Sequence, residues 1–340
     1  NGCAKKQHAE VSHLQTIDNQ VLNFNEENLL KILSSKNVAS QKGLVEMFDA
    51  SVGGTSVAMP FGGKHQLTEM EGSVQTLPIL NAENIETVSL ASWGFDAEIS
   101  SQNSLIGAAN AVVESVAKIV AMGGNYKNIR LSFQEYFEKL GNNPKKWGKP
   151  LASLLGAYDA QMNFELAAIG GKDSMSGSFQ DIHVPPTLIS FACANGEKKN
   201  IISPEFKKAG NKLYLFNHIS QENGMPNYGD LKQIFDFIFE NIKAKKIVSV
   251  KTIKEGGVAV ALSKMSFGNH LGAEVELAED LLLTKNIGSL IIESSAVLEN
   301  DLLQVIGEVS NSNILKINIF EFNIEKLLEA WKGTFEELFP

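Results

Sequence analysis

One segment, residues 105–122, constrains the fold more than any other part of this 340-residue chain. Its apolar side chains recur at the spacing of an α-helix, and the pair Gly123-Gly124 follows and ends it. Small residues near its start, Gly107, Ala108 and Ala109, would let the helix backbone lie close to a sheet. The segment therefore predicts a core helix packed on a β-sheet.

Strand-like and helical segments alternate along the rest of the chain, which predicts an α/β (α+β) fold. In the first part, the candidate strands are residues 55–59, 73–77, 87–93, 129–133 and 187–194, and a candidate helix over 147–167 precedes a Gly-rich loop. After a break in the pattern near residues 196–204, the candidate strands are 213–216, 247–250, 289–293 and 315–319. The candidate helices of this second part are residues 231–243, 258–267 and 299–308.

The length predicts two domains, because 340 residues exceed what one hydrophobic core usually serves. We expect a linker and leading helix over residues 1–40, and a first domain with a mixed sheet packed by helices over 41–200. An α/β second domain is expected over residues 201–340. The chain begins Asn-Gly-Cys-Ala rather than with Met, from which we expect a piece of a longer polypeptide.

Composition excludes some classes of function. The formal net charge of −9 argues against a nucleic-acid partner or an anionic membrane, since both need clustered positive charge. Cys3 and Cys193 are the two cysteines, so a disulfide framework or a Cys-based metal site is not expected, which fits the reducing cytoplasm. Cys193 lies in an apolar strand and is expected to be a small buried side chain.

Residues 169–178, Ile-Gly-Gly-Lys-Asp-Ser-Met-Ser-Gly-Ser, carry the densest polar chemistry of the chain. Glycines let backbone N–H groups approach an anion, a lysine supplies charge, hydroxyls donate hydrogen bonds, and the aspartate could hold Mg²⁺ against phosphates. The spacing is not that of a Walker A loop, and a tight surface turn remains the alternative. The candidates for binding substrate or nucleotide are Gly170, Gly171, Lys172, Asp173, Ser174 and Ser176.

Four separated stretches carry a family likeness. They are Gly-Lys-Asp-Ser-Met-Ser at 171–176 with 181–188, Asn-Val-Ala-Ser-Gln-Lys-Gly at 37–43, Pro-Phe-Gly-Gly-Lys at 60–64, and Gly-Ala-Ala-Asn-Ala-Val-Val-Glu at 107–114. In their order along the chain they resemble the second synthetase half of large, single-chain phosphoribosylformylglycinamidine synthases. With the domain that follows, the resemblance covers nearly the whole chain.

The resemblance implies a fold and a reaction. Each half of these enzymes, like aminoimidazole ribonucleotide synthetase, has an N-terminal domain that pairs its sheet with that of its twin, and an α/β C-terminal domain. The enzyme carries out the ATP- and glutamine-dependent amidation of formylglycinamide ribonucleotide in purine biosynthesis. ATP phosphorylates the formyl amide oxygen, and ammonia from a class I glutaminase domain displaces the phosphate. The implied partners are the first synthetase half and the glutaminase domain, and we expect this half alone to be inactive.

The resemblance also implies roles for single residues. Lys42 matches a lysine that contacts nucleotide (ATP or ADP), and Lys64, which lies in a matching stretch, is a further candidate for binding substrate or nucleotide. In shorter relatives, a glycine at the position of Gly171 contacts ATP, and a serine at the position of Ser174 contacts the ribonucleotide. Lys172 stands where those relatives have a metal-binding asparagine, so we expect it to contact phosphate directly.

Glu71 and Glu114 match carboxylates that bind Mg²⁺ beside an auxiliary nucleotide in this half. Lys118 and Thr252, however, stand where metal-binding members have asparagine and aspartate. A lysine four residues after Glu114 on one helix predicts an ion pair that competes with a metal. We therefore expect weak or absent auxiliary Mg²⁺ binding, and an exposed helix-surface ion pair is the alternative.

Two other functions stay open. The chain could be a stand-alone, ATP-dependent homodimer like aminoimidazole ribonucleotide synthetase, or a structural half whose site has decayed. A sheet face that the other half normally covers would also favour self-association of the isolated chain.

Overall fold

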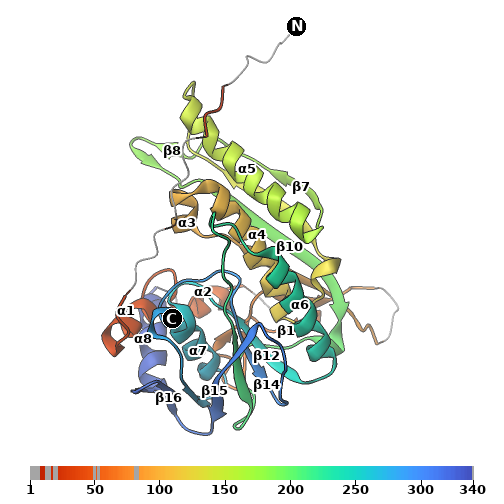
Figure 1. Ribbon diagram of the computed structural model, residues 1–340, viewed down its shortest axis with the longest axis vertical. Helices are drawn as coiled ribbons and strands as arrows, with labels where there is room; N and C mark the ends of the chain where they lie inside the picture. The colour runs from red at the N-terminus through yellow and green to blue at the C-terminus, as the bar shows by residue number, and fades with distance from the viewer. Residues whose placement is uncertain are drawn as a thin grey trace.

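Two β-sheets and their helices build the protein, and the computed structural model describes residues 8–11, 17, 22–48, 51, 54–79 and 84–338 (Figure 1). This mixture of strands and helices confirms the predicted α/β (α+β) class. The first sheet contains β1 (Ser56–Ala58), β4 (Ser73–Thr76), β5 (Thr87–Gly94), β6 (Arg130–Tyr136), β7 (Ala168–Lys172) and β10 (Thr187–Glu197). Its helices are α3 (Ala97–Gln102), α4 (Ser104–Ala121) and α5 (Pro144–Phe164).

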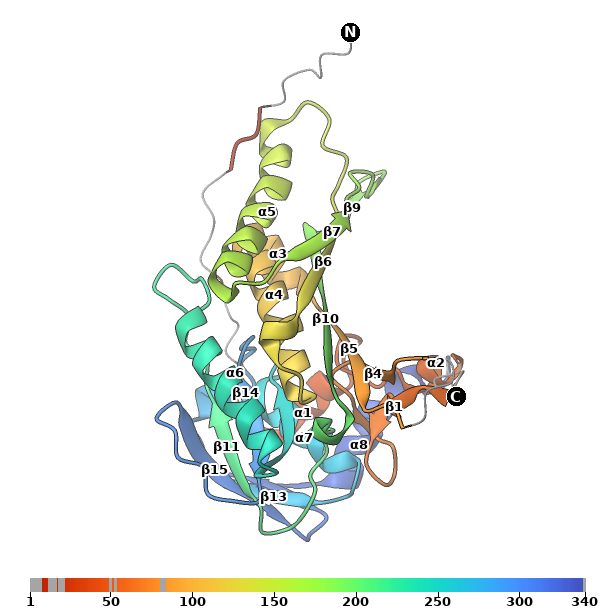
Figure 2. The same cartoon turned by 90° about the vertical axis from the view of Figure 1, so that its right-hand side faces the viewer.

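The first sheet has the order β1-β4-β5-β10-β6-β7, and its strands are antiparallel except for the parallel pair β6–β7. Helices α4 and α5 cover one face, whereas the opposite face of β5, β10 and β6 carries no helix from the described part of the chain (Figure 2). Two small hairpins extend this region, β2 (Phe61–Gly62) with β3 (Thr68–Glu69), and β8 (Ser178–Phe179) with β9 (Ile182–His183).

The second sheet has the order β12-β14-β11-β15-β13-β16-β17, with one parallel pair, β13–β16. Its strands are β11 (Lys212–Phe216), β12 (Ile247–Thr252), β13 (Gly272–Val275), β14 (Leu290–Ser294), β15 (Leu303–Ser310), β16 (Ile314–Ile317) and β17 (Phe320–Asn323). The remaining helices are α1 (Glu26–Leu33), α2 (Lys42–Glu46), α6 (Tyr228–Lys243), α7 (Gly257–Phe267) and α8 (Ile324–Glu336). Short 3₁₀ turns lie at Tyr126–Asn128, Lys198–Asn200 and Glu279–Leu281.

Helix α4 is the predicted core helix, and all but two of its 18 residues are buried. Asn103 caps its start by accepting hydrogen bonds from the N–H groups of Leu105 and Ile106, and Gly123 follows its end with a φ of 95°. The helix packs on β5 and β10 and also touches α5, α6 and β12. It is as long and apolar as a membrane-crossing helix, and its burial inside the protein, 89%, accounts for that composition.

Strands β12, β14 and β11 of the second sheet are buried on both faces, which explains the continuous apolar run of β11. Leu213 and Leu215 join a core with α1, α7 and α8, whereas Tyr214 and Phe216 join a core with α4, α5 and α6. Alternate side chains of one strand therefore belong to different cores.

Residues near the two ends of the described chain meet at Trp331 of α8, which is fully buried. The indole N–H donates to the carbonyl of Val38 at 2.9 Å, and the N–H of Ser40 donates to the carbonyl of Trp331 at 2.8 Å. Helix α1, the leading helix predicted within residues 1–40, packs against α7 and α8 of the second sheet.

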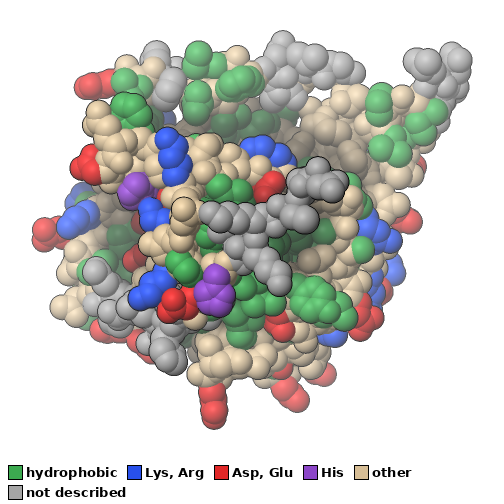
Figure 3. Space-filling view, turned by 90° about the horizontal axis from the view of Figure 1, so that it is seen from above, with side chains coloured by type: hydrophobic (Ala, Val, Ile, Leu, Met, Phe, Trp, Pro, Cys, Tyr) green, Lys and Arg blue, Asp and Glu red, His purple; other side chains and the backbone are tan. Residues whose placement is uncertain are grey.

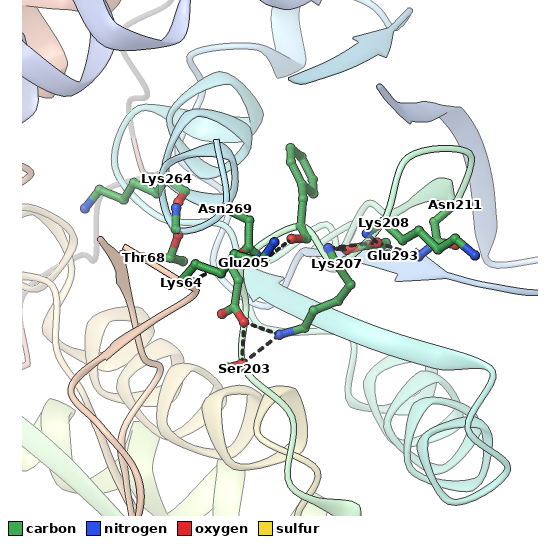
Figure 4. A network of polar contacts seen from close by, with 12 residues as sticks. Lys64, Thr68, Ser203, Glu205, Lys207, Lys208, Asn211, Lys264, Asn269 and Glu293 are labelled. Atoms are coloured by element: carbon green, nitrogen blue, oxygen red, sulfur yellow. Dashed lines mark hydrogen bonds and ion pairs between the residues drawn. The ribbon is translucent and has the colours of Figure 1, made fainter. Parts of the chain in front are cut away.

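A buried carboxylate fixes the segment that crosses from the first sheet to the second (Figure 4). Glu293 of β14 accepts hydrogen bonds from the N–H groups of Lys207 and Lys208 and, at 2.6 Å, from the side chain of Asn211. Burial raises the pKa of Glu293, although these donors oppose the shift. Backbone hydrogen bonds between Gly210 and Val309 (2.8 Å) and between Val309 and Asn211 (2.9 Å) also attach the crossing segment to the second sheet, at β15.

Two expectations for local structure are wrong. Residues 299–308 were expected to be a helix, but they enter strand β15, because β11 and β13 pair with this segment on both sides. The Gly-rich loop begins later than expected, because Ala168–Lys172 pairs with β6 as strand β7. Helix α8 was not expected, although Asn323 caps it and its apolar side chains have helical spacing.

The contact between α4 and α5 predicts the effect of a single methyl group. A Cβ at Gly156 of α5 would lie 2.0 Å from the carbonyl oxygen of Leu105, so Gly156→Ala should force the helices apart. We expect a loss of about 1–3 kcal/mol in the free energy of unfolding, measured with urea. The matched control is Gly333→Ala in α8, where a Cβ meets nothing within 4 Å and better helix propensity should add up to about 1 kcal/mol. Equal effects of the two substitutions would contradict this account.

Candidate functional site

Glu71, one of the two predicted metal ligands, lies between β3 and β4 with its carboxylate buried. Its Oε1 accepts from Lys251 Nζ at 2.8 Å and from the N–H of Thr252 at 3.1 Å. Its Oε2 accepts from Thr252 Oγ1 at 2.7 Å. Thr252, which stands where an aspartate was expected in a metal site, is thus a hydrogen-bond donor to Glu71.

Glu114, the other predicted ligand, forms the expected ion pair with Lys118 on α4 at 2.7 Å. The alternative of an exposed pair is wrong, because the side chains of Lys118 and Glu114 are 4% and 6% exposed. The second oxygen of Glu114 accepts from the N–H of Phe95 at 3.1 Å. Lys118 also donates to the carbonyl of Trp93 at 2.7 Å and lies 4.4 Å from the centre of the Trp93 ring.

A third ion pair, between Lys264 and Glu69, accompanies the ion pairs of Glu71 and Glu114. Lys264 of α7 contacts Glu69 at 2.8 Å, and Lys251 Nζ donates to the Glu69 carbonyl at 3.1 Å. Lys254 lies 3.9 Å from Glu114 and is the most exposed of the lysines involved. We call these residues the carboxylate–lysine cluster: Glu69, Glu71, Glu114, Lys118, Lys251, Lys254 and Lys264.

Burial and the neighbouring charges together set the pKa values of the cluster. Burial would raise the pKa of the Glu71 carboxyl, but Lys251, Lys254 and Lys118 outweigh burial and bring it to about 2. Burial and repulsion from Lys254 lower the pKa of Lys118 to about 8, although Glu114 opposes this shift. Both groups are therefore mainly charged at neutral pH.

A cavity of about 390 Å³ opens beside the cluster. Trp93, Glu114 and Lys254 line it together with residues of the α1–α2 connection, Lys36, Asn37 and Gln41. Among the described residues, no group of three or more His, Cys, Asp or Glu side chains is placed to hold a metal ion. The cavity wall thus combines the Trp93 ring with three lysines and with four carboxylates, which are Asp96, Glu98, Glu114 and Glu255.

The predicted phosphate-binding residues lie at the far edge of the first sheet. Gly170, Gly171 and Lys172 are exposed in edge strand β7, and Asp173, Ser174 and Ser176 follow in the loop. A Cβ at Gly171 would lie 2.5 Å from the Phe133 carbonyl oxygen, so a close approach to β6 is one reason for glycine at this position. The N–H of Ser174 donates to the Glu135 carbonyl at 3.1 Å, and the hydroxyls of Ser174 and Ser176 lie 2.9 Å apart.

The uncovered face of the first sheet carries apolar side chains among polar ones such as Ser132 and Gln134. We call it the open sheet face and define it by outward residues of β5, β10 and β6: Ala91, Trp93, Phe191, Cys193 and Tyr136. Trp93 is 51% exposed, and Phe191 and Tyr136 are each 37% exposed. The expectation of a buried Cys193 is wrong, because nothing in the described chain covers this face, and the thiol is exposed and free. Hydrophobic side chains also reach the surface at the end of the molecule seen in Figure 3.

Strand register places Lys172 beside the open sheet face. Ile189 of β10 pairs with Gln134 of β6, and Gln134 pairs with Lys172 of β7. Residues paired across neighbouring strands point to the same side of a sheet. Whatever packs on the open sheet face would therefore meet Lys172.

The structure does not bring all predicted site residues together. Strands β4 and β7 are separated by four strand spacings of about 4.8 Å, or about 19 Å, so Glu71 and Lys172 belong to different places. Lys42 of α2 forms an ion pair with Glu46 and lines another cavity, of about 200 Å³. Lys64 is exposed between β2 and β3, and its N–H donates to Asn269 at 2.9 Å (Figure 4).

Glu135 is a residue that the sequence analysis missed. It is 7% exposed on β6, at the position after Leu131 and Phe133 in the alternating inward pattern, and its Oε1 lacks a hydrogen-bond partner in the described structure. Burial and the nearby charge of Asp173 raise the pKa of Glu135 to about 7. A charged residue at an inward strand position was the signal that could have identified it.

The raised pKa of Glu135 predicts a pH dependence of stability. Between pH 4.5, the ordinary pKa of this carboxyl group, and about pH 7, the native state holds a proton on Glu135 that the unfolded state has released. The contribution of Glu135 to the free energy of unfolding is therefore complete below pH 4.5 and is lost as pH rises through 7. Glu135→Gln should remove that loss and exceed the wild type at pH 8 by on the order of 1–2 kcal/mol, a value reduced for screening by water.

Urea unfolding at pH 5 and pH 8 would measure the effect. Glu308→Gln, which breaks an exposed ion pair with Lys212, should keep the wild-type pH dependence. The same difference between Glu135→Gln and the wild type at both pH values would contradict the prediction.

Comparison with known proteins finds relatives of one kind. The chain is 25% identical over 359 residues to the phosphoribosylformylglycinamidine synthase subunit PurL of Methanocaldococcus jannaschii, covering 92% of this chain and 46% of that protein. The PurL subunit of Methanobrevibacter smithii is 24% identical, with the same coverage of 92% and 46%. No protein-family model matches the chain.

A solved structure with a similar fold is T. maritima PurL complexed with FGAR. It has a TM-score of 0.67 and 12% identity, over 89% of this chain and 53% of that one. The chain spans about half the length of the relatives it matches. Together with the motifs, these comparisons confirm the resemblance inferred from the sequence: the chain is similar, in sequence and in fold, to one synthetase half of PurL.

Proposed function

We propose that this chain is the second synthetase half of a phosphoribosylformylglycinamidine synthase. In this proposal the assembled enzyme, in the cytoplasm, uses ATP and ammonia from glutamine to convert the formyl amide of formylglycinamide ribonucleotide into an amidine. This half supplies substrate-binding or nucleotide-binding residues and an interface, and it does not turn over alone. The observation that carries the proposal is the similarity to PurL subunits over 92% of the chain.

The polar segment of β7 and its loop suits the substrate side of this chemistry. Lys172 and the hydroxyls of Ser174 and Ser176 are solvent-accessible at one edge of the sheet. A lysine and two hydroxyls can hold a phosphate through charge and hydrogen bonds, and positioning with charge neutralisation provides most of the catalysis in phosphoryl transfer. Because Lys172 lies beside the open sheet face, a partner on that face would help to form the substrate site.

The exposed side chains of the open sheet face favour the binding of a large partner. Trp93, Phe191 and Tyr136 expose aromatic rings there, and aromatic side chains are enriched in the centres of protein interfaces. In the proposal, the first synthetase half covers this face. A second copy of the chain would cover it if the protein were instead a stand-alone homodimer.

Ser174→Ala in the assembled enzyme tests the role of the loop. Loss of one hydrogen bond, about 1 kcal/mol, should raise the KM for formylglycinamide ribonucleotide about 5-fold. Steady-state kinetics would measure this value, with Ser312→Ala in an exposed loop of the second sheet as the control. An unchanged KM would contradict a substrate-binding role for this loop.

Thiol reactivity tests the interface. In a Cys3→Ser background, Cys193 should react readily with a maleimide in the isolated chain and at least about 10-fold more slowly after the first synthetase half is added, because buried thiols are inaccessible to reagents. Phe191→Glu should prevent this protection, whereas Ile319→Glu, at an 87% exposed position on the second sheet, should not.

Two other outcomes would change the proposal. Protection that depends only on the concentration of this chain would favour the homodimer. An unchanged labelling rate in the assembled enzyme would contradict an interface at the open sheet face.

A further inference from the structure

We propose that the carboxylate–lysine cluster is a metal-free junction between the two sheets, in which lysine ammonium groups take the places that divalent cations would need beside Glu71 and Glu114. The inference concerns metal binding and stability, and it holds whether or not the chain belongs to a ligase. It disagrees with the Mg²⁺ site that the family resemblance implies for these two residues.

Protein donors already occupy the carboxylate oxygens. Glu71 receives Lys251 and the N–H of Thr252 on one oxygen and the Thr252 hydroxyl on the other. Glu114 receives Lys118 on one oxygen and the N–H of Phe95 on the other. A carboxylate has about four lone-pair positions, of which these donors use three on Glu71 and two on Glu114. Mg²⁺ needs carboxylate oxygens at about 2.0–2.1 Å, so it would compete with the bound ammonium group for each carboxylate.

Displacement would be strongly unfavourable. The side chains of Lys118 and Lys251 are 4% and 5% exposed, so moving a carboxylate to a metal would leave a buried ammonium group without its partner. Within the cluster, three carboxylates face four lysines, whereas Asp96, Glu98 and Glu255 line the adjoining cavity together with Lys36 and Lys285. A divalent cation among the buried side chains of the cluster would therefore meet repulsion from nearby ammonium groups.

The cluster joins elements of both sheets. Glu69 and Glu71 belong to the β3–β4 region, Glu114 and Lys118 to α4, and Lys251 to β12 of the second sheet. The contacts between Glu71 and β12 span 181 residues of sequence. Built-in cations thus make this junction independent of the supply of metal.

Metal titration of the intact chain tests the proposal. The melting temperature should be the same in EDTA and in saturating Mg²⁺ or Mn²⁺, and the electron paramagnetic resonance spectrum of Mn²⁺ should show no bound ion. A rise in melting temperature of a few degrees with either metal, or bound Mn²⁺ in the wild type, would overturn it.

Lys118→Ala gives the complementary test. Without Lys118, Glu114 loses its close cation and gains space, so the variant should melt at a lower temperature than the wild type and recover a few degrees on addition of Mn²⁺. Lys127→Ala, which breaks an exposed ion pair with Asp236, is the matched control and should not respond to Mn²⁺. If Lys118→Ala does not fold, Lys118→Gln replaces it, and a folded variant that does not respond to Mn²⁺ would refute the substitution of lysine for metal.

Discussion

Burial of α4 on all its sides is the constraint on which the rest of the structure depends. The helix packs on the first sheet and on α5, and it also reaches α6 and strand β12 of the second sheet. Any charge on such a helix lies away from water and needs a partner within the protein. Glu114 and Lys118 meet this requirement through each other, and Lys118 also bonds to the backbone of β5. Apolar packing and the ionic junction are thus two results of the same placement.

Local patterns predicted the parts of the fold that local interactions decide. The core helix and strand β10 follow directly from apolar spacing, because each is long and strongly periodic. The structure of residues 299–308 was not predicted correctly, because Leu302, Leu303 and Ile306 fit the spacing of a helix as well as that of a strand. Pairing with β11 and β13, which are distant in sequence, settles that segment as a strand. Cys193 shows a different limit: an apolar strand predicts that both faces are covered, whereas one face of β10 stays open in the described chain.

In the candidate site, too, contacts between residues close in sequence were predictable and contacts between distant residues were not. The pair of Glu114 with Lys118 was predictable because residues four apart on a helix are neighbours. The partners of Glu71 and Glu69 were not, because Thr252 and Lys264 lie 181 and 195 residues further along the chain. Motif resemblance identified the polar residues of 170–176 but not their surroundings. Only the sheet register places Lys172 beside the open sheet face and a buried carboxyl, Glu135, beneath the same loop.

The contact between Val38 and Trp331 has a consequence for biosynthesis. These residues are 293 positions apart, and α1 packs on helices α7 and α8, which the ribosome makes near the end of the described chain. At about 5–20 residues per second, the early segment waits for about 15–60 s before its packing site exists. During that interval the apolar side of α1, with Leu29 and Leu33, has no native cover. During synthesis of the described residues, nascent-chain chaperones would therefore find a binding site in α1 until α7 and α8 are made.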